Sequence, residues 1–509
     1  YGINLSRALT ESARKSSGRY ATLSTGRVQG PTLRFVVERE QEIETFVPVP
    51  RWEIQATVEI DGETLHAEFE VEKIDIEAEA EKVAAVSHGK EGSVEDVESK
   101  TSLVAPPFPF DLSSLQGEAH RHFGMAPRHS LDVAERLYLD ALISYPRTSS
   151  QKLPPSIDYR ELLQRLSKNP NYERQAAALL DIRDLHPNEG KNADPAHPAV
   201  YPTGALPKRS LEPREFKVYD LIVKRFMATF GQPATRETIK ATIRVNGLKF
   251  YLRGSRITAA GWIDFYKPYA RFEDVTIPPV SKGTRVKFLS VKAVEKFSQP
   301  SPRYNQSSLL REMETNEIGT KATRAEIIET LFRRAYIKGN RIEATPLGIQ
   351  IVSVLEKYCP RVLDVAFTRE LEAMMNNIEL GKDEKQRVVD EAIRHLRPIM
   401  DELKAHEQEI GERLSSKIKQ ARIAQLTLSV ACPKCGRRLH VVRSRKSGKR
   451  FIGCIGKWEG ECSFTLPLPQ LGTLTLLDQT CSNCGFQLVK VASNGRRPLV
   501  TCPMCYVKK

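Results

Sequence analysis

The sequence predicts a multidomain α+β protein that ends in two cysteine-rich metal modules. Its 509 residues exceed what one hydrophobic core usually organises, and 40% of them are apolar, so several folded domains are expected. Two hairpin patterns of alternating apolar residues lie far apart in a chain that otherwise has helical periodicity. Eight of the nine cysteines fall in the last 79 residues.

The charge of the chain is positive and uneven. The net charge is +14, and residues 431–509 contain 14 basic and 3 acidic residues, whereas residues 61–100 contain 13 acidic and 4 basic ones. A basic excess favours a polyanionic partner, most simply nucleic acid. The sequence has no apolar run of the ~18 to 20 residues that a membrane span needs, and no signal peptide. We therefore expect no membrane partner and a cytoplasmic, nucleoid-associated location.

The N-terminal part changes from helical to β periodicity. The first fifty residues are expected to be helical, with Pro31 in the first turn of a helix. Apolar residues then alternate on either side of Asp61-Gly62, and again around Asn246-Gly247, which predicts two hairpins. We interpret the hairpins as two halves of one β-rich domain, interrupted by an inserted helical domain in which Ser130 caps a helix.

The segment after the second hairpin predicts a winged-helix unit. Helices are expected over 307–314 and 323–332, followed by a short hairpin that turns at Gly339-Asn340. Thr323-Arg-Ala-Glu326 fits a capping box for the second helix. Residues 380–425 are charged and helical, and the lone Cys359 is expected to be a buried thiol.

These patterns give a domain order. The expected domains are a helical part (1–50), a β-rich part (51–104), the insert (105–233), the second β-rich part (234–297), a winged-helix and helical part (298–425), and two four-cysteine zinc ribbons (430–466 and 478–509).

The spacing of the last eight cysteines predicts two structural Zn²⁺ sites. Pairs of Cys-x-x-Cys hooks separated by a hairpin's length of chain place four thiolates around one tetrahedral ion. The expected ligands are Cys432, Cys435, Cys454 and Cys462 in the first module and Cys481, Cys484, Cys502 and Cys505 in the second. The alternative is surface or redox cysteines, which this spacing disfavours.

The cysteine-rich tail also has a basic surface with aromatic residues. Such a surface suits single-stranded nucleic acid through charge and stacking, and protein docking is the competing interpretation. The residues are Arg443, Arg445, Lys446, Lys449, Arg450, Phe451, Trp458, Phe464 and Phe486.

A tyrosine in the insert has an unusual setting. Tyr145 follows an apolar run, and by base rate such a residue packs with its hydroxyl satisfied. However, Pro146 stiffens the next residue, and Arg147 lies within reach of a phosphate that the phenol could attack. Four hydroxyl residues, Ser144, Thr148, Ser149 and Ser150, surround the same turn. A phenol with a pKa of about 10 needs neighbouring positive charge or a base to act as a nucleophile.

The segment Ile143-Ser-Tyr-Pro-Arg-Thr-Ser149 resembles the active-site motif of type IA DNA topoisomerases, close to archaeal and topoisomerase III versions. Further segments resemble the family in the same order. They are Ser24-Thr-Gly-Arg-Val-Gln29, Ala196-His197-Pro-Ala-Val-Tyr-Pro-Thr203, Ser301-Pro-Arg303-Tyr304, Gly319-Thr-Lys-Ala-Thr323-Arg324-Ala-Glu-Ile-Ile328 and Arg334-Ala-Tyr336-Ile337.

The resemblance implies a toroid of helical winged-helix-like domains and a split β-rich gate domain, followed by zinc ribbons. It implies that Tyr145 forms a 5′-phosphotyrosine link during transient single-strand cleavage, and that Arg147 and His197 stabilise the phosphate and assist proton transfer. The implied DNA contacts are Ser24, Thr25, Gly26, Arg27, Val28, Gln29, Arg303, Thr323, Arg324 and Arg334.

Each implied role has a simpler competitor. Without the resemblance, His197 is a structural or exposed histidine and the arginines are solvated surface charges. Arg27 precedes a helix N-terminus, where amides and a guanidinium can bind phosphate together. Thr323 caps its helix whether or not it also touches DNA.

The family's TOPRIM domain, which supplies acidic residues for Mg²⁺, has no recognisable counterpart in this sequence. Asp75-x-Glu77-x-Glu79 echoes an acidic triad, but we interpret it as a solvated edge or linker because no buried parallel strand precedes it. We therefore expect Mg²⁺ to act through a TOPRIM domain or subunit outside this sequence, and the isolated chain to bind single-stranded or underwound DNA while cleaving it poorly.

Other classes remain open at this point. A tyrosine recombinase needs a spaced Arg-His-Arg set and leaves a 3′ link. A non-enzymatic, single-stranded DNA-binding zinc-ribbon protein, or an inactive fragment, would leave Tyr145 inert. A reverse gyrase requires a Gly-x4-Gly-Lys-[Ser/Thr] helicase motif, which this sequence does not contain.

Overall fold

The computed structural model describes residues 1–18, 20–270, 272–379, 381–444, 447–457, 460–492 and 498–506. The chain forms two compact units, which we call the barrel unit, residues 38–329, and the ribbon unit, residues 1–37 with 330–509. The boundaries between them fall inside helices α2 (Gln29–Thr45) and α11 (Arg324–Arg333). None of the described helices has the length and apolar character needed to cross a membrane.

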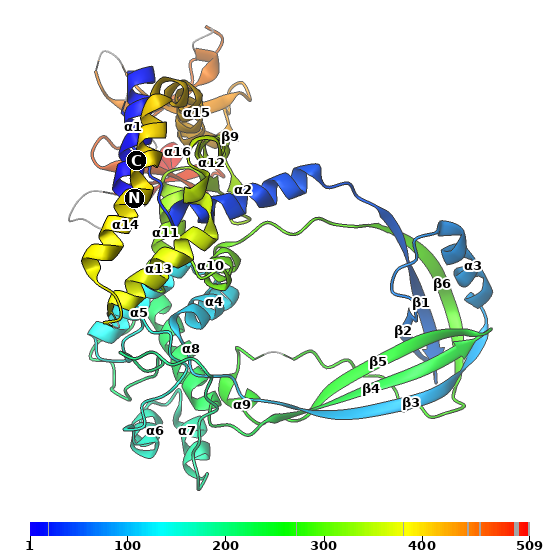
Figure 1. Cartoon of the computed structure of the whole chain (residues 1–509). Coiled ribbons are helices and arrows are strands. Elements are labelled where there is room, and N and C mark those ends of the chain that lie inside the picture. Colours follow the sequence, from blue (N-terminus) through cyan, green and yellow to red (C-terminus); the bar gives the residue numbers. More distant parts are fainter. Residues whose placement is uncertain are drawn as a thin grey trace. The chain divides into compact units, whose positions relative to one another are not determined.

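Six antiparallel strands of the barrel unit close into a barrel in the order β1-β2-β5-β4-β3-β6 (Figure 1). The strands are β1 (Pro50–Ile60), β2 (Glu63–Phe69), β3 (Glu91–Val104), β4 (Ala234–Val245), β5 (Leu248–Ala259) and β6 (Arg285–Phe297). The alternating residues of β1 fill the interior, because Ile54, Ala56, Val58 and Ile60 are all buried. The two hairpins predicted from alternation therefore belong to one β structure.

The turns of both hairpins explain why the sequence signal was clear. Asp61 and Gly62 have φ values of 51° and 86°, and Asn246 and Gly247 have 47° and 84°. Positive φ at both central residues defines the tight turn whose twist matches paired strands. Strand β2 stops at Phe69, and Val71, the next apolar residue in the alternating pattern, is 47% exposed and lies beyond the strand.

The acidic stretch after β2 is more ordered than predicted. Glu77 begins helix α3 (Glu77–Ser87), and Glu77 and Glu79 occupy its first turn, where the helix dipole favours negative charge. Asp75 forms an ion pair with Arg51 at 3.2 Å. The three acids are exposed, as the interpretation of a solvated segment expected, but the two glutamates start a helix rather than lie at a strand edge or in a linker.

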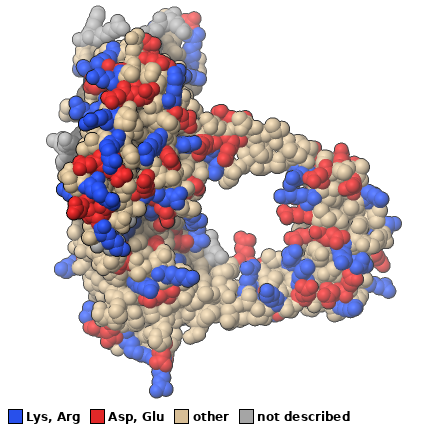
Figure 2. All heavy atoms as spheres, viewed as in Figure 1, with Lys and Arg blue, Asp and Glu red and all other residues tan. Residues whose placement is uncertain are grey.

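The outer face of the barrel carries both signs of charge (Figure 2). Arginines of the second hairpin and acids of neighbouring strands form ion pairs across it, with distances of 2.7 to 3.0 Å. The pairs are Arg244–Glu95, Arg253–Glu68 and Arg256–Glu237. The acidic excess of residues 61–100 is thus compensated in part by basic residues from β4 and β5.

The helical insert leaves the barrel between β3 and β4 and has its own core. Its helices are α4 (Leu112–Phe123), α5 (Pro127–Leu139), α6 (Tyr159–Ser167), α7 (Glu173–Leu180) and α8 (Pro213–Ala228), and the short α9 (Ile263–Tyr266) packs against α8. The predicted cap at Ser130 was wrong. Helix α5 begins at Pro127 after the N-cap Ala126, and Ser130 is a buried residue inside it, because proline favours the first helical turn.

Two helices follow the barrel, as predicted, but the second starts differently. Asn305 caps α10 (Gln306–Thr315) through a hydrogen bond from the Ser308 amide at 2.8 Å. Ahead of α11, the hydroxyl of Thr323 accepts a hydrogen bond from the Thr320 amide at 3.0 Å, and the Arg324 amide bonds to the Thr320 carbonyl at 3.1 Å. The first turn is thus organised from Thr320, one turn earlier than the capping box expected at Thr323.

The ribbon unit contains helices and the predicted wing. Ile337–Lys338 (β7) pairs with Glu343–Ala344 (β8) as the short hairpin. Its remaining helices are α1 (Gly2–Ser17), α12 (Pro346–Tyr358), the 3-10 turn η1 (Pro360–Leu363), α13 (Val365–Glu379), α14 (Lys385–Ala405) and α15 (Glu407–Leu426). Cys359 is buried, as expected, and burial raises the pKa of its thiol to about 12.

The C-terminal strands form two small sheets that share one core. Strands β9 (Thr427–Ala431), β10 (Arg438–Arg443), β11 (Arg450–Cys454) and β12 (Thr465–Pro467) make the first, with the 3-10 turn η2 (Ile455–Lys457) after β11. Strands β13 (Thr473–Thr480), β14 (Gln487–Ala492) and β15 (Leu499–Thr501) make the second, followed by α16 (Pro503–Tyr506). Leu439 and Ile452 of the first sheet and Val489 of the second lie in one buried cluster.

The contact between α1 and α15 gives a prediction about Gly411. A Cβ at this position would lie 2.3 Å from the Ser12 carbonyl oxygen, so Gly411→Ala should push the helices apart and destabilise the ribbon unit by about 1–3 kcal/mol. Calorimetric melting of the full chain measures the shift. The control is Gly117→Ala in α4, where a Cβ would meet only the Ser307 hydroxyl oxygen at 3.7 Å, and an equal loss in both variants would contradict the prediction.

Candidate active site and metal centres

The tyrosine loop, residues 143–150, starts from a rigid anchor at the end of α5. Leu142 and Ile143 are each 1% exposed in the core of the insert, and Ile143 forms an isolated antiparallel bridge with Pro202. The hydroxyl of Thr203 donates to the Ala141 carbonyl at 2.7 Å. The chain ahead of Tyr145 is therefore held against the segment that carries His197.

The hydroxyl residues around Tyr145 join its loop to the histidine segment, residues 194–203. The Ser144 hydroxyl donates to the Ala199 carbonyl and accepts from the Tyr201 amide, both at 3.0 Å. The buried Thr148 hydroxyl donates to the His197 carbonyl, also at 3.0 Å. The crowding of hydroxyls seen in the sequence thus has a structural use, because it replaces the regular strand pairing that two loops lack.

Tyr145 lies between two aromatic neighbours. Its ring centroid is 5.2 Å from that of Tyr138, on α5, and 4.6 Å from that of His197. The ring is half-buried, and no other described residue forms a hydrogen bond with its hydroxyl. A packing tyrosine usually has its hydroxyl satisfied, so this arrangement leaves the phenol oxygen available for a ligand.

Arg147 is held by a carboxylate of helix α5, the helix that also carries Tyr138. Its guanidinium donates to Glu135 at 2.5 Å, and this hydrogen bond raises the pKa of Arg147 above its ordinary value. Glu135 and Tyr138 are three residues apart on α5, so one face of that helix contacts both Arg147 and Tyr145. The structure therefore brings Tyr145, Arg147 and His197 together as a cluster.

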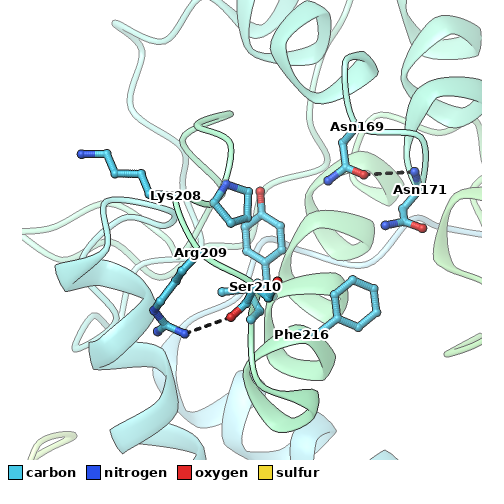
Figure 3. A pocket seen from close by; sticks show the side chains of 9 residues that line it. Asn169, Asn171, Lys208, Arg209, Ser210 and Phe216 are labelled. Carbon is cyan, nitrogen blue, oxygen red and sulfur yellow. Dashed lines mark hydrogen bonds between the residues drawn. The ribbon is translucent and has the colours of Figure 1, made fainter.

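An open pocket of about 560 Å³ lies elsewhere in the insert, beside α8 (Figure 3). Its side chains include Asn169, Lys208 and Phe216, and the Asn171 amide donates to the Asn169 side chain at 3.1 Å. No residue of the tyrosine loop lines it. The candidate site is thus built from loops rather than from this pocket.

The segment 24–29 lies in the ribbon unit, and its first residue, Ser24, accepts hydrogen bonds from two other predicted DNA-contacting residues. The Ser24 hydroxyl accepts from Gln29 at 3.0 Å and from Arg334 at 3.2 Å. Thr25 and Gln29 are buried, and Arg27 forms an ion pair with Glu372 at 3.2 Å. Gly26 and Val28 complete the turn before α2. The bond from Arg334 to Ser24 thus brings together predicted DNA-contacting residues from the two parts of the chain, 1–37 and 330–509, that form this unit.

The remaining predicted DNA contacts are in the barrel unit. Arg303 binds both oxygens of Glu40, at 2.9 and 3.0 Å, and Arg324 donates to the Ile318 carbonyl at 3.1 Å and pairs with Glu314 at 3.4 Å. Thr323 is exposed. These arginines are therefore compensated by carboxylates in the unbound protein rather than freely solvated.

Both cysteine groups have the geometry of a closed tetrahedral site. The eight sulfurs form two sets, each with all its ligand atoms within 4.8 Å of one another. Sulfur–sulfur distances of 3.3 to 3.9 Å bracket the roughly 3.8 Å that four Zn–S bonds of ~2.3 Å require. The four-cysteine predictions are confirmed as groups that could hold one ion each.

The predicted nucleic-acid surface of the ribbons was partly wrong. Arg450 is 6% exposed, and its guanidinium donates to the carbonyls of Pro469, Leu471 and Gly472. Phe464 and Phe486 are buried in the shared core, because a small ribbon needs its large side chains inside. Arg443 and Lys449 are exposed and Phe451 is half-buried, whereas Arg445, Lys446 and Trp458 lie outside the described residues.

Comparison with known proteins identifies the family. The sequence model of the DNA topoisomerase family matches residues 1–390. DNA topoisomerase 1 of Pyrococcus horikoshii is 43% identical over 504 residues, 99% of this chain and 73% of that protein. DNA topoisomerase 1 of Methanothermobacter thermautotrophicus is 38% identical over 509 residues, 100% of this chain and 68% of that protein.

A solved structure agrees with these matches. Topoisomerase I from Thermotoga maritima aligns with a TM-score of 0.61 and 26% identity, over 94% of this chain and 75% of that one. The chain thus belongs to the DNA topoisomerase family of isomerases. Within that family it is a type IA DNA topoisomerase, as the resemblance of its tyrosine motif implied.

Sequence reasoning missed the acidic partners in the site. Glu135 on Arg147, Glu40 on Arg303 and Glu372 on Arg27 are all remote in sequence or on other elements, so no local pattern marked them. Asp194 had a usable signal, since an Asp that starts a turn commonly bonds the amides two and three residues on.

The cysteine geometry predicts two zinc ions per chain. Replacing Cys484 with Ser removes one thiolate of the second group, so the zinc content should fall from two ions to one. Because the sheets share a core, chelator-driven release from the first group should also become faster. Metal release followed with a colorimetric chelator measures both, and Cys359→Ala, which touches neither group, should keep two ions.

Proposed function

We propose that this chain carries the nucleophile of a type IA topoisomerase and cleaves one DNA strand transiently through Tyr145. The observation that carries the proposal is the half-buried Tyr145 ring, whose hydroxyl has no hydrogen-bond partner among the described residues, next to Arg147 and His197. A joined pair of loops holds this cluster, which suits a reaction that needs a fixed direction of attack.

In the proposed reaction, the phenol oxygen of Tyr145 attacks a backbone phosphorus. A bond from that oxygen to phosphorus forms, and the bond from phosphorus to the 3′-oxygen breaks. The products are a 5′-phosphotyrosine and a free 3′-hydroxyl, which takes up a proton as the phenol gives one up. Religation is the reverse attack by that hydroxyl, so the phosphodiester energy is conserved and passage of a strand through the break relaxes negative supercoils or decatenates DNA.

Arg147 and His197 have distinct parts in this proposal. Arg147 is always charged and can stabilise the crowded phosphate in the transition state, provided that it exchanges part of its contact with Glu135 for the phosphate. His197 packs against the Tyr145 ring at 4.6 Å between centroids, and in this proposal its imidazole assists the proton transfer once DNA is bound.

We also propose that single-stranded or underwound DNA follows the arginine-bearing segments. Within the ribbon unit these are residues 24–29 and Arg334, and within the barrel unit Arg303, Thr323 and Arg324. Phosphates would take the place of the carboxylates on Arg27, Arg303 and Arg324. Because each such contact releases counterions, binding should weaken steeply with salt.

We further propose that strand cleavage requires Mg²⁺ held by a TOPRIM domain supplied from outside these 509 residues. Within the described residues, the two cysteine groups are the clusters of three or more side chains that could hold a metal. Soft thiolates suit Zn²⁺ and not Mg²⁺, which prefers oxygen ligands. The acidic ligands for Mg²⁺ would therefore come from the TOPRIM part, whether it is a separate subunit or another segment of the protein.

Tyr145→Phe tests the nucleophile. The variant keeps the ring and its contacts with Tyr138 and His197 but lacks the attacking oxygen, so the covalent protein–DNA adduct should disappear. A single-stranded oligonucleotide labelled at either end is incubated with the chain, a TOPRIM polypeptide of a type IA enzyme and Mg²⁺, and denaturing electrophoresis then measures the adduct and its polarity. A 3′ link, or an adduct that persists in the variant, would refute the proposal, and Tyr138→Phe is the matched control.

Addition of a TOPRIM polypeptide tests the division of labour. The isolated chain with Mg²⁺ should bind the oligonucleotide but yield little adduct, and a TOPRIM polypeptide of a type IA enzyme should raise the yield at least about tenfold. Omission of Mg²⁺ or use of Tyr145→Phe should remove this gain. Supercoil relaxation by the chain alone would show that the TOPRIM part is not needed.

A further inference from the structure

The carboxylate of Asp194 lies at the junction of three segments of the barrel unit. One oxygen accepts hydrogen bonds from the amides of Ala196 and His197, at 3.0 and 3.2 Å. The other accepts from the amide and the hydroxyl of Ser149, at 3.2 and 3.0 Å. One side chain thus fixes both the start of the histidine segment and the end of the tyrosine loop.

A lysine from a third segment completes the junction. Lys321, in the turn between α10 and α11, forms a hydrogen-bonded ion pair with the same Asp194 oxygen that binds Ser149. The two residues are 127 positions apart. A contact of this kind joins the helix pair after the barrel to the loops around Tyr145.

This ion pair differs from the other polar contacts between the insert and α10–α11. The Asp194 side chain is 3% exposed, whereas those of Glu314, Glu326 and Glu329, which contact Ser113 or Arg128 across the same boundary, are 45 to 61% exposed. Exposed pairs contribute little, whereas the nearly buried Asp194 carboxylate would keep only neutral donors if Lys321, whose side chain is 32% exposed, were removed. The position of the Asp194 carboxylate therefore depends on Lys321.

We propose that Asp194 is a positioning residue for strand cleavage and that Lys321 controls it from the α10–α11 segment. With Lys321 in place, the carboxylate holds the tyrosine loop and the histidine segment in the arrangement in which His197 packs on Tyr145. When Lys321 is removed, the buried anion draws solvent or its donors shift, and both loops loosen. The arrangement of the loops around Tyr145 thus depends on whether the α10–α11 segment contacts the insert through Lys321.

The inference rests on the proposed role of Tyr145 but makes a separate structural claim. Amide hydrogen exchange of the full chain tests that claim without any catalysis. Lys321→Met, which keeps a long unbranched side chain but removes the ammonium group and its charge, should raise exchange in peptides covering 144–151 and 194–202. Lys296→Ala, which removes an exposed lysine paired with Glu53 on the barrel, should leave those peptides unchanged.

Kinetics then distinguish positioning from DNA binding. Single-turnover adduct formation with the TOPRIM polypeptide and saturating oligonucleotide should slow about tenfold or more in Lys321→Met and in Asp194→Asn, because a small misplacement of the reacting group is costly. The dissociation constant for the oligonucleotide should stay within about twofold. Lys321→Arg should restore most of the rate, and the double variant should be no slower than either single one.

Three results would overturn the inference. They are unchanged exchange in the two peptides, rate losses that add in the double variant, or a loss of DNA affinity that accounts for the whole effect in Lys321→Met. The last would make Lys321 a phosphate-binding residue instead. An adduct that persists in Tyr145→Phe would refute the proposed function, while the exchange experiment would still decide the role of the Asp194–Lys321 pair.

Discussion

The hydrogen bonds between the tyrosine loop and the histidine segment are the constraint on which the candidate site depends. These two stretches share one isolated strand bridge, at Ile143 and Pro202, so regular pairing does not hold them. Ser144, Thr148 and Asp194 do so instead, through bonds of about 3 Å between a side chain of one stretch and the backbone of the other. Such bonds tolerate irregular loops, and they leave the tyrosine ring free of any structural duty beyond packing.

The barrel anchors the inserted domain that carries this site. The insert departs after β3 and returns at β4, and Val104 and Ala234, its two ends, are paired neighbours in the antiparallel ladder. The Trp262 indole donates to the Val104 carbonyl at 3.0 Å and packs in the core of the insert, which reinforces the junction. A domain inserted at one strand pair can fold around its own core while its ends stay fixed. The closed barrel in turn has no free edge that the inserted segment would need to protect.

Ion pairs with carboxylates recur at the arginines that the resemblance assigns to DNA. Arg147, Arg303 and Arg27 each contact a glutamate, and the pairs are partly shielded from solvent. A guanidinium paired with a glutamate is held in a fixed orientation. It also carries less bound water, which an incoming phosphate would otherwise have to displace. In the proposed DNA contacts, the exchange of a carboxylate for a phosphate would also limit the net gain per contact, which favours reversible binding over very tight binding.

The sequence by itself determined the local features of this protein, and the tertiary structure decided how they meet. Positive-φ turns at Asp61-Gly62 and Asn246-Gly247 and the cysteine spacing are encoded within a few residues, so both hairpins and both metal groups could be predicted. The motif around Tyr145 pointed to the reaction class. The closure of the barrel, the burial of Arg450 and the ion pair of Asp194 with Lys321 depend on residues that are distant in the chain. Only packing selects such partners, because burial decides which charges must be paired and which side chains must be covered.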